Sequence, residues 1–271
     1  MTRYERILIT GANGRLGSEL RKGLTACAKT IRLGGRRPFD HLAENEEQAV
    51  FELSDMDATI AATAGCDAIV HYGGAPLESP WQTILDSNIR GSYHIYEGAR
   101  KHGVKRVIYA SSVHAVGYHE ISAHIGVDAP VRPDSLYGVS KNFVESLSQL
   151  YWDKFGIESA CLRIFSSFPE PTDRRMLWSY LSFNDCVRLT AAALTAPRIG
   201  HTLSFGISDD KVKVVDNSGA NHLGFIPQDS SEPWRQAIEA RTEMPNPQDP
   251  AATYLGGWFC TLDHPDDERE T

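Results

Sequence analysis

The chain has 271 residues, 41% of them hydrophobic, and its 27 Lys and Arg against 35 Asp and Glu give a net charge of −8. This hydrophobicity predicts a folded core and excludes general disorder, which requires low hydrophobicity together with high net charge. The acidic balance argues against a nucleic-acid partner, and no apolar run approaches the roughly 18 residues of a membrane span. Five scattered cysteines without CxxC spacing predict reduced thiols, with no metal site and no disulfide framework, in a cytoplasmic protein.

Short apolar runs alternate with helical patterns in the first part of the chain. Strands are expected at 6–10, 30–33, 49–53, 68–72, 106–110 and 158–163, and helices at 56–64, 84–101 and 135–155. Another helix is expected where Leu16, Leu20 and Leu24 recur on one helical face. Near-continuous apolar strands that alternate with helices indicate an α/β fold, a doubly wound parallel sheet covered on both faces.

The rest of the chain is richer in proline and polar residues, with one clear helix expected at 183–195. We interpret residues 166–262 as a small C-terminal substrate-binding cap, interleaved with a core formed by residues 1–165. The charged stretch 263–271 is expected to be a disordered tail.

A glycine-rich turn with a GxxGxxG pattern joins the first expected strand to the following helix. Glycines here allow a sharp turn, close approach of a pyrophosphate and tight helix packing, while the helix N-terminus attracts phosphate. This context predicts a Rossmann-like dinucleotide-binding core, the alternative being a plain turn before a helix. The predicted cofactor contacts in the turn are Gly11, Asn13, Gly14, Arg15, Leu16 and Gly17.

The end of the second expected strand carries no carboxylate and continues as Gly35-Arg36-Arg37. An acidic side chain at this place favours NAD, whereas arginine suits the 2′-phosphate of NADP. Guanidinium groups bind phosphate oxygens through paired hydrogen bonds. Gly35, Arg36 and Arg37, with Arg15 in the glycine turn, therefore predict a preference for NADP over NAD. The alternative is two solvent-facing arginines on a loop.

Two further segments are expected to border the dinucleotide. Glu52 and Leu53 follow the third expected strand and would flank the adenine. Gly73 and Gly74 follow the fourth, where the lack of a side chain lets the backbone pass close to the cofactor.

Tyr137 and Lys141 form a YxxxK pattern at the start of an expected helix, so the two side chains share one face. A lysine there is expected to lower the pKa of the tyrosine, which could then take a proton from a substrate hydroxyl. Ser112 follows the strand at 106–110, at the edge of the sheet where ligands bind in open α/β folds. These three residues are the predicted catalytic group.

Several motifs together resemble the extended short-chain dehydrogenase/reductase superfamily. They are TGANGRLG, HYGGA, SNIRGSYHIYEGAR, YASS and YGVSK, which spread over most of residues 5–165. The resemblance implies a catalytic Ser112–Tyr137–Lys141 triad supported by Asn88, and a homo-oligomer formed through the helices at 84–101 and 135–155. It also implies that Asn88, Tyr137, Lys141 and Ile164 border the cofactor.

More specific stretches resemble the uronate dehydrogenases. They are SSVHAVGYH, RPDSLYGVSKNFVESLSQLYWDKFG and PEPTDRRMLWSYLSFND. The resemblance implies oxidation of the anomeric hydroxyl of an acidic hexose to a lactone, with the sugar carboxylate bound by Arg175. The substrate contacts that it implies are Pro76, Ser112, Val113, His114, Tyr137, Ser166 and Arg175.

Three departures from that family bear on the substrate and the cofactor. There is no acid near Gly35, and Val113 and Pro76 stand where the family has polar residues. A site that loses hydrogen-bonding groups discriminates differently, so an analogue such as sulfoquinovose is also a candidate substrate. A sugar-nucleotide epimerase or dehydratase is a second reading, disfavoured by the short second half, and a non-catalytic NADP-binding redox sensor is a third.

Overall fold

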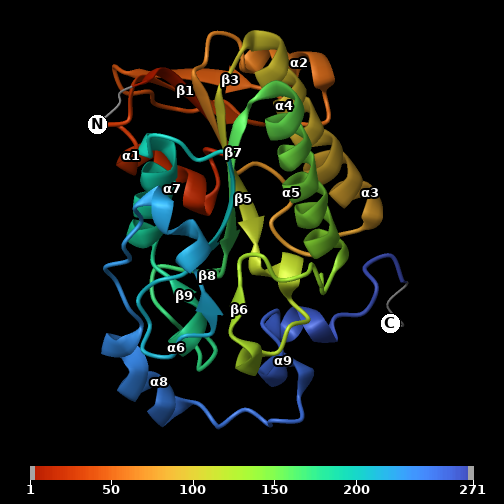
Figure 1. The fold of residues 1–271 in the computed structure, drawn as a ribbon, viewed down its shortest axis with the longest axis vertical. Coiled ribbons are helices and arrows are strands. Elements are labelled where there is room, and N and C mark those ends of the chain that lie inside the picture. The colour runs from red at the N-terminus through yellow and green to blue at the C-terminus, as the bar shows by residue number, and fades with distance from the viewer. Residues whose placement is uncertain (1–3, 268–271) are drawn as a thin grey trace.

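The computed structural model describes residues 4–267 and centres on a seven-stranded, wholly parallel sheet (Figure 1). Its strands are β1 (Tyr4–Thr10), β2 (Ala28–Gly35), β3 (Glu46–Val50), β4 (Ala68–His71), β5 (Arg106–Ser112), β7 (Glu158–Ile164) and β10 (His201–Gly206). The order across the sheet is β10-β7-β5-β4-β1-β2-β3. The predicted doubly wound, Rossmann-like sheet is therefore confirmed.

Helices cover both faces of the sheet (Figure 1). α1 (Arg15–Gly23) and α7 (Phe183–Thr195) pack on one face, and α2 (Met56–Ala62), α4 (Gly91–His102) and α5 (Leu136–Phe155) on the other. Each interface is an apolar core, one built around Ile9, Leu20 and Leu189 and the other around Leu8, Tyr96 and Val144. Apolar side chains on both faces of the strands explain their near-continuous hydrophobic sequences.

The helix expected at 84–101 is interrupted by a wider turn. α3 (Trp81–Ile84) leads into the π-helical segment η1 (Leu85–Arg90), which continues directly as α4. Such π-turns inside helices often occur at functional sites because they redirect a side chain. Here the segment contains the buried Asn88.

The sheet differs from the expectation at its two edges. β3 spans Glu46–Val50 rather than 49–53, because Glu46 and Glu47 form ion pairs with Arg21 and Arg32 that make these charged residues acceptable in the strand. β10 was not expected at all, since its sequence mixes polar and apolar residues. Its buried Thr202 is satisfied by the Ile199 carbonyl and His222, which makes a polar residue tolerable in a strand.

The smaller elements gather at one end of the molecule, at the bottom of Figure 1. They are β6 (Ile125–Gly126) paired with β11 (Val215–Asp216), β8 (Ser166–Ser167) paired with β9 (Tyr180–Leu181), α6 (Met176–Ser179), α8 (Arg235–Arg241) and α9 (Pro250–Thr253). 3-10 turns complete the chain at η2 (Val113–Val116), η3 (Ile121–Ala123), η4 (Ser218–Leu223), η5 (Glu232–Trp234) and η6 (Gly257–Thr261). α7 and β10 belong to the sheet layer although they follow residue 165, so the small end and the sheet alternate along the chain.

Part of the expected disordered tail, residues 268–271, lies outside the described residues. Residues 263–267 differ from the expectation because they form a turn in which Asp266 accepts a hydrogen bond from the Trp81 amide at 3.1 Å. Among the described helices, none combines the length and the apolar character needed to span a bilayer.

Candidate active site

The carboxyl ends of β1 and β4 meet where the strand order reverses. A Cβ atom added to Gly11, after β1, would lie only 2.7 Å from the Tyr72 carbonyl oxygen, so the two backbones are in direct contact. This crevice is where open α/β sheets bind ligands. Gly73 also faces the turn, since its amide donates to Thr10 Oγ1 at 3.1 Å.

The glycine turn leaves the start of α1 open to a ligand. Gly14 occupies the N-cap position, and no side chain within residues 4–267 caps this end of the helix. A Cβ atom on Gly17 would lie 2.1 Å from the Gly11 carbonyl oxygen, so only glycine allows the helix to start this close. The free N–H groups and the small cradle fit a pyrophosphate.

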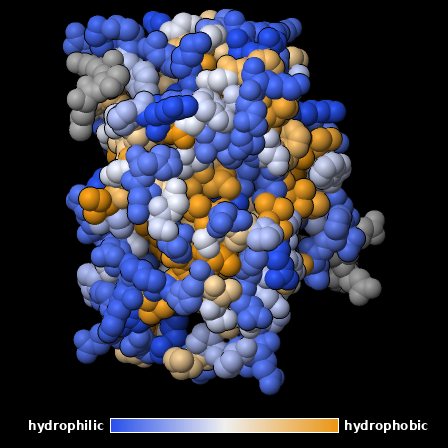
Figure 2. All heavy atoms as spheres, viewed as in Figure 1, coloured by the Kyte–Doolittle hydropathy of each residue, from blue (hydrophilic) through white to orange (hydrophobic). Residues whose placement is uncertain are grey.

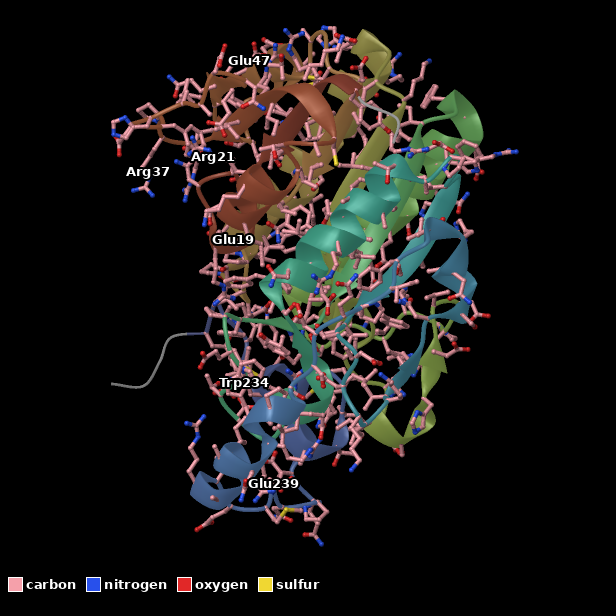
Figure 3. The ribbon with its side chains drawn as sticks, turned by 90° about the vertical axis from the view of Figure 1, so that its left-hand side faces the viewer. Glu19, Arg21, Arg37, Glu47, Trp234 and Glu239 are labelled. Atoms are coloured by element: carbon pink, nitrogen blue, oxygen red, sulfur yellow. The ribbon has the colours of Figure 1, made fainter. Side chains whose placement is uncertain are left out.

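The residues after β2 are placed at the rim of this crevice. Asn13 lies against Gly35, where an added Cβ atom would be 2.3 Å from Asn13 Oδ1. Arg36 and Arg37 are exposed, and neither forms an ion pair in the described chain. Figure 3 shows Arg37 projecting outward from this edge of the molecule. Arg15, expected beside them, instead stacks over the Phe168 ring at 4.2 Å.

The other predicted cofactor residues border the same edge of the sheet. Leu53 contacts Gly73, where an added Cβ atom would lie 3.1 Å from Leu53 Cδ1. Glu52 is exposed beside it. Leu16 is half-buried in the first turn of α1, and Ile164 ends β7 next to β5.

Asn88 connects three segments around the crevice. Its Oδ1 accepts from the Ala75 amide at 2.7 Å, and its Nδ2 donates to Ser140 Oγ at 3.1 Å. Gly74, with φ near +140°, passes so close that an added Cβ atom would lie 2.7 Å from Asn88 Oδ1. Asn88 thus holds the loop after β4 against α5.

The three predicted catalytic side chains lie together. Ser112 ends β5 and hydrogen-bonds to the phenol of Tyr137, which lies in the first turn of α5. Lys141 Nζ lies 5.0 Å from the centre of the Tyr137 ring and donates to the Ala110 carbonyl at 2.7 Å. All three are buried, at 5%, 8% and 7% exposure respectively.

The protonation of this group differs from the expectation that Lys141 lowers the pKa of Tyr137. Burial raises the pKa of Tyr137 to about 12, and the hydrogen bond from Ser112 offsets only part of that rise. Burial lowers the pKa of Lys141 to about 7. The reason is geometric, because the ammonium points to the Ala110 carbonyl rather than to the phenol oxygen.

His114 belongs to a pair that the sequence did not suggest. Its Nδ1 lies 2.7 Å from Oδ2 of the fully buried Asp134 carboxylate. The ring stacks on Phe259 at 3.7 Å and meets the Tyr137 ring edge-on at 5.7 Å. Asp134 and Phe259 were missed because nothing in their local sequence marks them; only the fold brings them to His114.

Arg175 is a half-buried cation that forms no ion pair within residues 4–267. Its Nη1 donates to Ser166 Oγ at 2.6 Å and its Nη2 to the Leu255 carbonyl at 2.5 Å, while its buried Nε has no partner in the described chain. Burial lowers the pKa of the guanidinium, and nearby Asp173 offsets this only in part. A partly desolvated cation that forms no ion pair is costly and suits an anionic ligand.

A C-terminal segment, residues 255–259, connects Arg175 to the catalytic group. Leu255 accepts from Arg175, a Cβ atom on Gly257 would lie 2.4 Å from Arg175 Nε, and Phe259 packs on His114 and Tyr137. Val113 packs with Leu255 in a small apolar cluster. The predicted substrate residues Ser112, Val113, His114, Tyr137, Ser166 and Arg175 are thus joined by one segment, whereas Pro76 is exposed on the loop after β4.

Residues 7–182 match the family described as the NAD dependent epimerase/dehydratase family. The chain belongs to that family. It is 45% identical over 259 residues to the uronate dehydrogenase of Pseudomonas syringae pv. tomato, and the match covers 95% of this chain and 94% of the relative. The resemblance predicted from the sequence motifs is therefore confirmed.

Solved structures of relatives agree with this family member over nearly their whole length. Glucuronic acid dehydrogenase from Chromohalobacter salexigens superimposes with a TM-score of 0.95 at 42% identity, covering 98% of this chain and 100% of that chain. A uronate dehydrogenase variant from Agrobacterium tumefaciens, complexed with NAD, gives a TM-score of 0.92 at 42% identity, covering 96% and 98%.

In this family member, Glu78 is a further residue that the sequence did not single out. Its carboxylate accepts from the Leu136 amide at 3.0 Å and from the Tyr137 amide at 2.7 Å. Ser135 caps the next amide of α5, that of Gly138. Glu78 therefore fixes the loop after β4 to the helical turn that carries Tyr137.

Within residues 4–267 no cluster of three or more His, Cys, Asp or Glu side chains could hold a metal ion.

Proposed function

We propose that this protein oxidises the anomeric hydroxyl of a hexuronate, such as glucuronate or galacturonate, to the lactone, with a nicotinamide dinucleotide as hydride acceptor. The observation that carries the proposal is the half-buried Arg175, which forms no ion pair in the described chain and is linked to Tyr137 through the segment 255–259. Arginine is the expected partner of a sugar carboxylate, because its fork matches both oxygens. Similarity over the full length to uronate dehydrogenases supports the same substrate class.

The chemistry follows from the residues around Tyr137. When bound, the dinucleotide supplies the hydride acceptor for the hydrogen on C1 of the sugar. Tyr137, as phenolate, takes the proton of the C1 hydroxyl, and Ser112 donates a hydrogen bond to the same oxygen. The Lys141 ammonium, drawn toward the phenolate, stabilises its charge. Since burial holds the pKa of Tyr137 near 12, we expect the oxidation rate to rise with pH across the neutral to alkaline range.

For the cofactor, we propose binding across the crevice between β1 and β4, with NADP preferred over NAD. The cradle at Gly11 and the uncapped start of α1 support a pyrophosphate there. The exposed and unpaired Arg36 and Arg37 support a 2′-phosphate at the end of β2, since no carboxylate follows that strand before Asp40.

We further propose a cytoplasmic homo-oligomer whose small end acts as the substrate cap. Apolar side chains are exposed along α4 and α5, and Figure 2 shows apolar surface over this side of the molecule. They are Tyr93, Val139, Phe143, Leu150 and Phe155. Apolar patches of this kind on soluble proteins mark contact surfaces.

The test is a substrate panel followed by the absorbance of the reduced dinucleotide. Glucuronate, galacturonate, sulfoquinovose, glucose and glucose 6-phosphate are each supplied with NAD and with NADP. We expect turnover of at least one uronate. Turnover of sulfoquinovose alone would assign the variant substrate that Val113 and Pro76 suggest. Conversion of a nucleotide-sugar without added cofactor, with no uronate oxidised, would favour an epimerase or dehydratase instead.

A further inference from the structure

A buried ion pair lies directly behind the catalytic group. Glu145 on α5 and Arg163 on β7 are 5% and 1% exposed. Arg163 Nε donates to Glu145 Oε1 at 3.0 Å, and its Nη2 donates to Oε2 at 2.9 Å. A bidentate ion pair that is shielded from water fixes both side chains in one arrangement. Neither residue takes part in the reaction proposed above.

The same carboxylate is tied to the strand that holds the catalytic group. Ser111 Oγ donates to Glu145 Oε1 at 2.6 Å. Ser111 stands between Ala110, whose carbonyl accepts from Lys141, and Ser112, which bonds to Tyr137. A shift of Glu145 would therefore move both anchor points of the catalytic group.

Glu145 also lies one helical turn beyond Lys141. The two residues are four apart on α5, so their side chains share a face. The negative charge of Glu145 raises the pKa of Lys141, whereas burial, the larger effect, lowers it to about 7.

The other groups that face Lys141 carry no opposing charge at neutral pH. Burial lowers the pKa of His71 on β4 to about 3, and it raises the pKa of Cys161 on β7 to about 12. Burial likewise raises the pKa of Tyr109 on β5 well above its usual value and that of Tyr137 to about 12. The remaining charged side chain nearby is Arg163, which forms its ion pair with Glu145. Within the described residues, Glu145 is thus the anion that acts on Lys141.

We propose that Glu145 is a positioning residue for Lys141: its carboxylate, fixed by Arg163 and Ser111, holds the Lys141 side chain beside Tyr137. This proposal rests on the proposed function only because Lys141 takes part in the reaction proposed there. The interaction itself exists in the protein without substrate.

The experiment follows the titration of Lys141 directly. The chain contains eight lysines, so lysine labelled with carbon-13 at Cε gives a short set of NMR signals, and a Lys141→Met sample assigns the one of interest. In Glu145→Gln we expect the Lys141 midpoint to fall by about one pH unit, the lower end for removal of an opposite charge. In the pH profile of kcat/KM for the sugar substrate, we also expect the rising limb to move to higher pH, because Tyr137 loses a neighbouring cation.

A matched control is present at the opposite end of the sheet. Arg106 and Glu158 form a second, partly buried ion pair at the opposite ends of β5 and β7. Glu158→Gln removes the same chemical group and should leave the Lys141 midpoint and the pH profile unchanged. An unchanged Lys141 midpoint in Glu145→Gln, or an equal shift in Glu158→Gln, would overturn the proposal.

A second variant covers the case in which Glu145→Gln does not fold, since breaking one half of a buried pair is destabilising. Glu145→Asp keeps the charge but draws it back by one methylene. We expect a smaller fall of the Lys141 midpoint, and no fall at all would contradict the proposal. Because the NMR titration needs no turnover, it can fail while the substrate panel succeeds, and the reverse.

Discussion

Arg175 is the residue whose surroundings say most about the ligand. Its side chain is half-buried, its two Nη atoms donate to a hydroxyl and a carbonyl, and its buried Nε has no partner in the described chain. Gly257, with a positive φ of 64°, lets the backbone pass against it without a side chain. A partly desolvated cation with neutral partners is stabilised when an anion binds, which supports the proposal that this position selects an acidic sugar.

We expect Arg175→Met to lower kcat/KM for glucuronate by about 10- to 100-fold, the equivalent of a charge-assisted hydrogen bond. The rate with a neutral aldose should change little, because that sugar has no carboxylate for Arg175 to bind. Arg174→Met is the matched control, since Arg174 donates to the Glu239 and Thr242 carbonyls near α8, where Figure 3 labels Glu239. Steady-state kinetics on both sugars decide the matter, and an equal loss on both sugars would contradict a carboxylate-binding role.

Arg36 is the residue on which cofactor choice is expected to depend. We expect the parent enzyme to show a lower KM for NADP than for NAD, and Arg36→Ala to remove the difference by weakening contact with the 2′-phosphate. Arg198→Ala is a suitable control because Arg198 is also exposed but precedes β10 at the other edge of the sheet. Equal KM values for the two cofactors in the parent enzyme would rule out the preference.

At the scale of elements, the start of α5 is the best-anchored helix end near the site. Three successive amides are satisfied, two by Glu78 from the loop after β4 and one by the Ser135 cap. Helix termini leave such amides unpaired unless a side chain supplies an acceptor. Tyr137 is thereby fixed relative to the loop that borders the crevice.

Glu78→Ala should therefore affect both stability and rate. We expect the melting temperature to fall by a few degrees, as for loss of a helix cap of about 1 kcal/mol. We expect kcat to fall as well, because the turn carrying Tyr137 becomes mobile. Asp55→Ala removes the cap of α2, where Asp55 accepts from the Ala58 amide at 3.0 Å. That variant should show the same thermal loss with unchanged kcat, and a parallel loss of kcat would remove the special role of Glu78.

The elements of the sheet could be predicted from the sequence wherever strands are apolar on both faces. β1, β4, β5 and β7 have this character and were expected close to their observed places. β10 was not, because its buried polar residues are satisfied by partners distant in sequence. The π-helical turn around Asn88 was also unexpected, since helical periodicity alone does not distinguish it from a regular turn.

At the scale of the whole molecule, the segment 255–259 joins the two parts of the candidate site. The segment 255–259 returns from the small end to lie between Arg175 and His114. The glycine turn, YxxxK pattern and Ser112 could be read from local motifs. Asp134, Phe259 and Glu78 could not, because their roles depend on contacts with residues 20, 145 and 59 positions away.

Phe259→Ala tests whether the end of the chain contributes to the sugar site. We expect KM for the sugar to rise, because His114 and Tyr137 lose the ring against which they pack, while the dissociation constant of the dinucleotide stays the same. Trp258→Ala is the control, since Trp258 is 53% exposed whereas Phe259 is 3% exposed. A change confined to dinucleotide binding, measured by fluorescence titration, would place Phe259 outside the sugar site.

At this scale, the positions of individual charges are more informative than the net charge. The net charge of −8 gives no hint of an anionic ligand. The cations without carboxylate partners in the described chain nevertheless include Arg36, Arg37, Lys141 and Arg175, all near the crevice or the proposed sugar site.

The most direct test of the proposed reaction uses glucuronate deuterated at C1. We expect the deuterium to appear on the reduced dinucleotide, a primary isotope effect on kcat/KM, and the lactone as the first product detected by NMR. Deuterium that stays on the sugar, or a product oxidised at another carbon, would contradict oxidation of the anomeric hydroxyl.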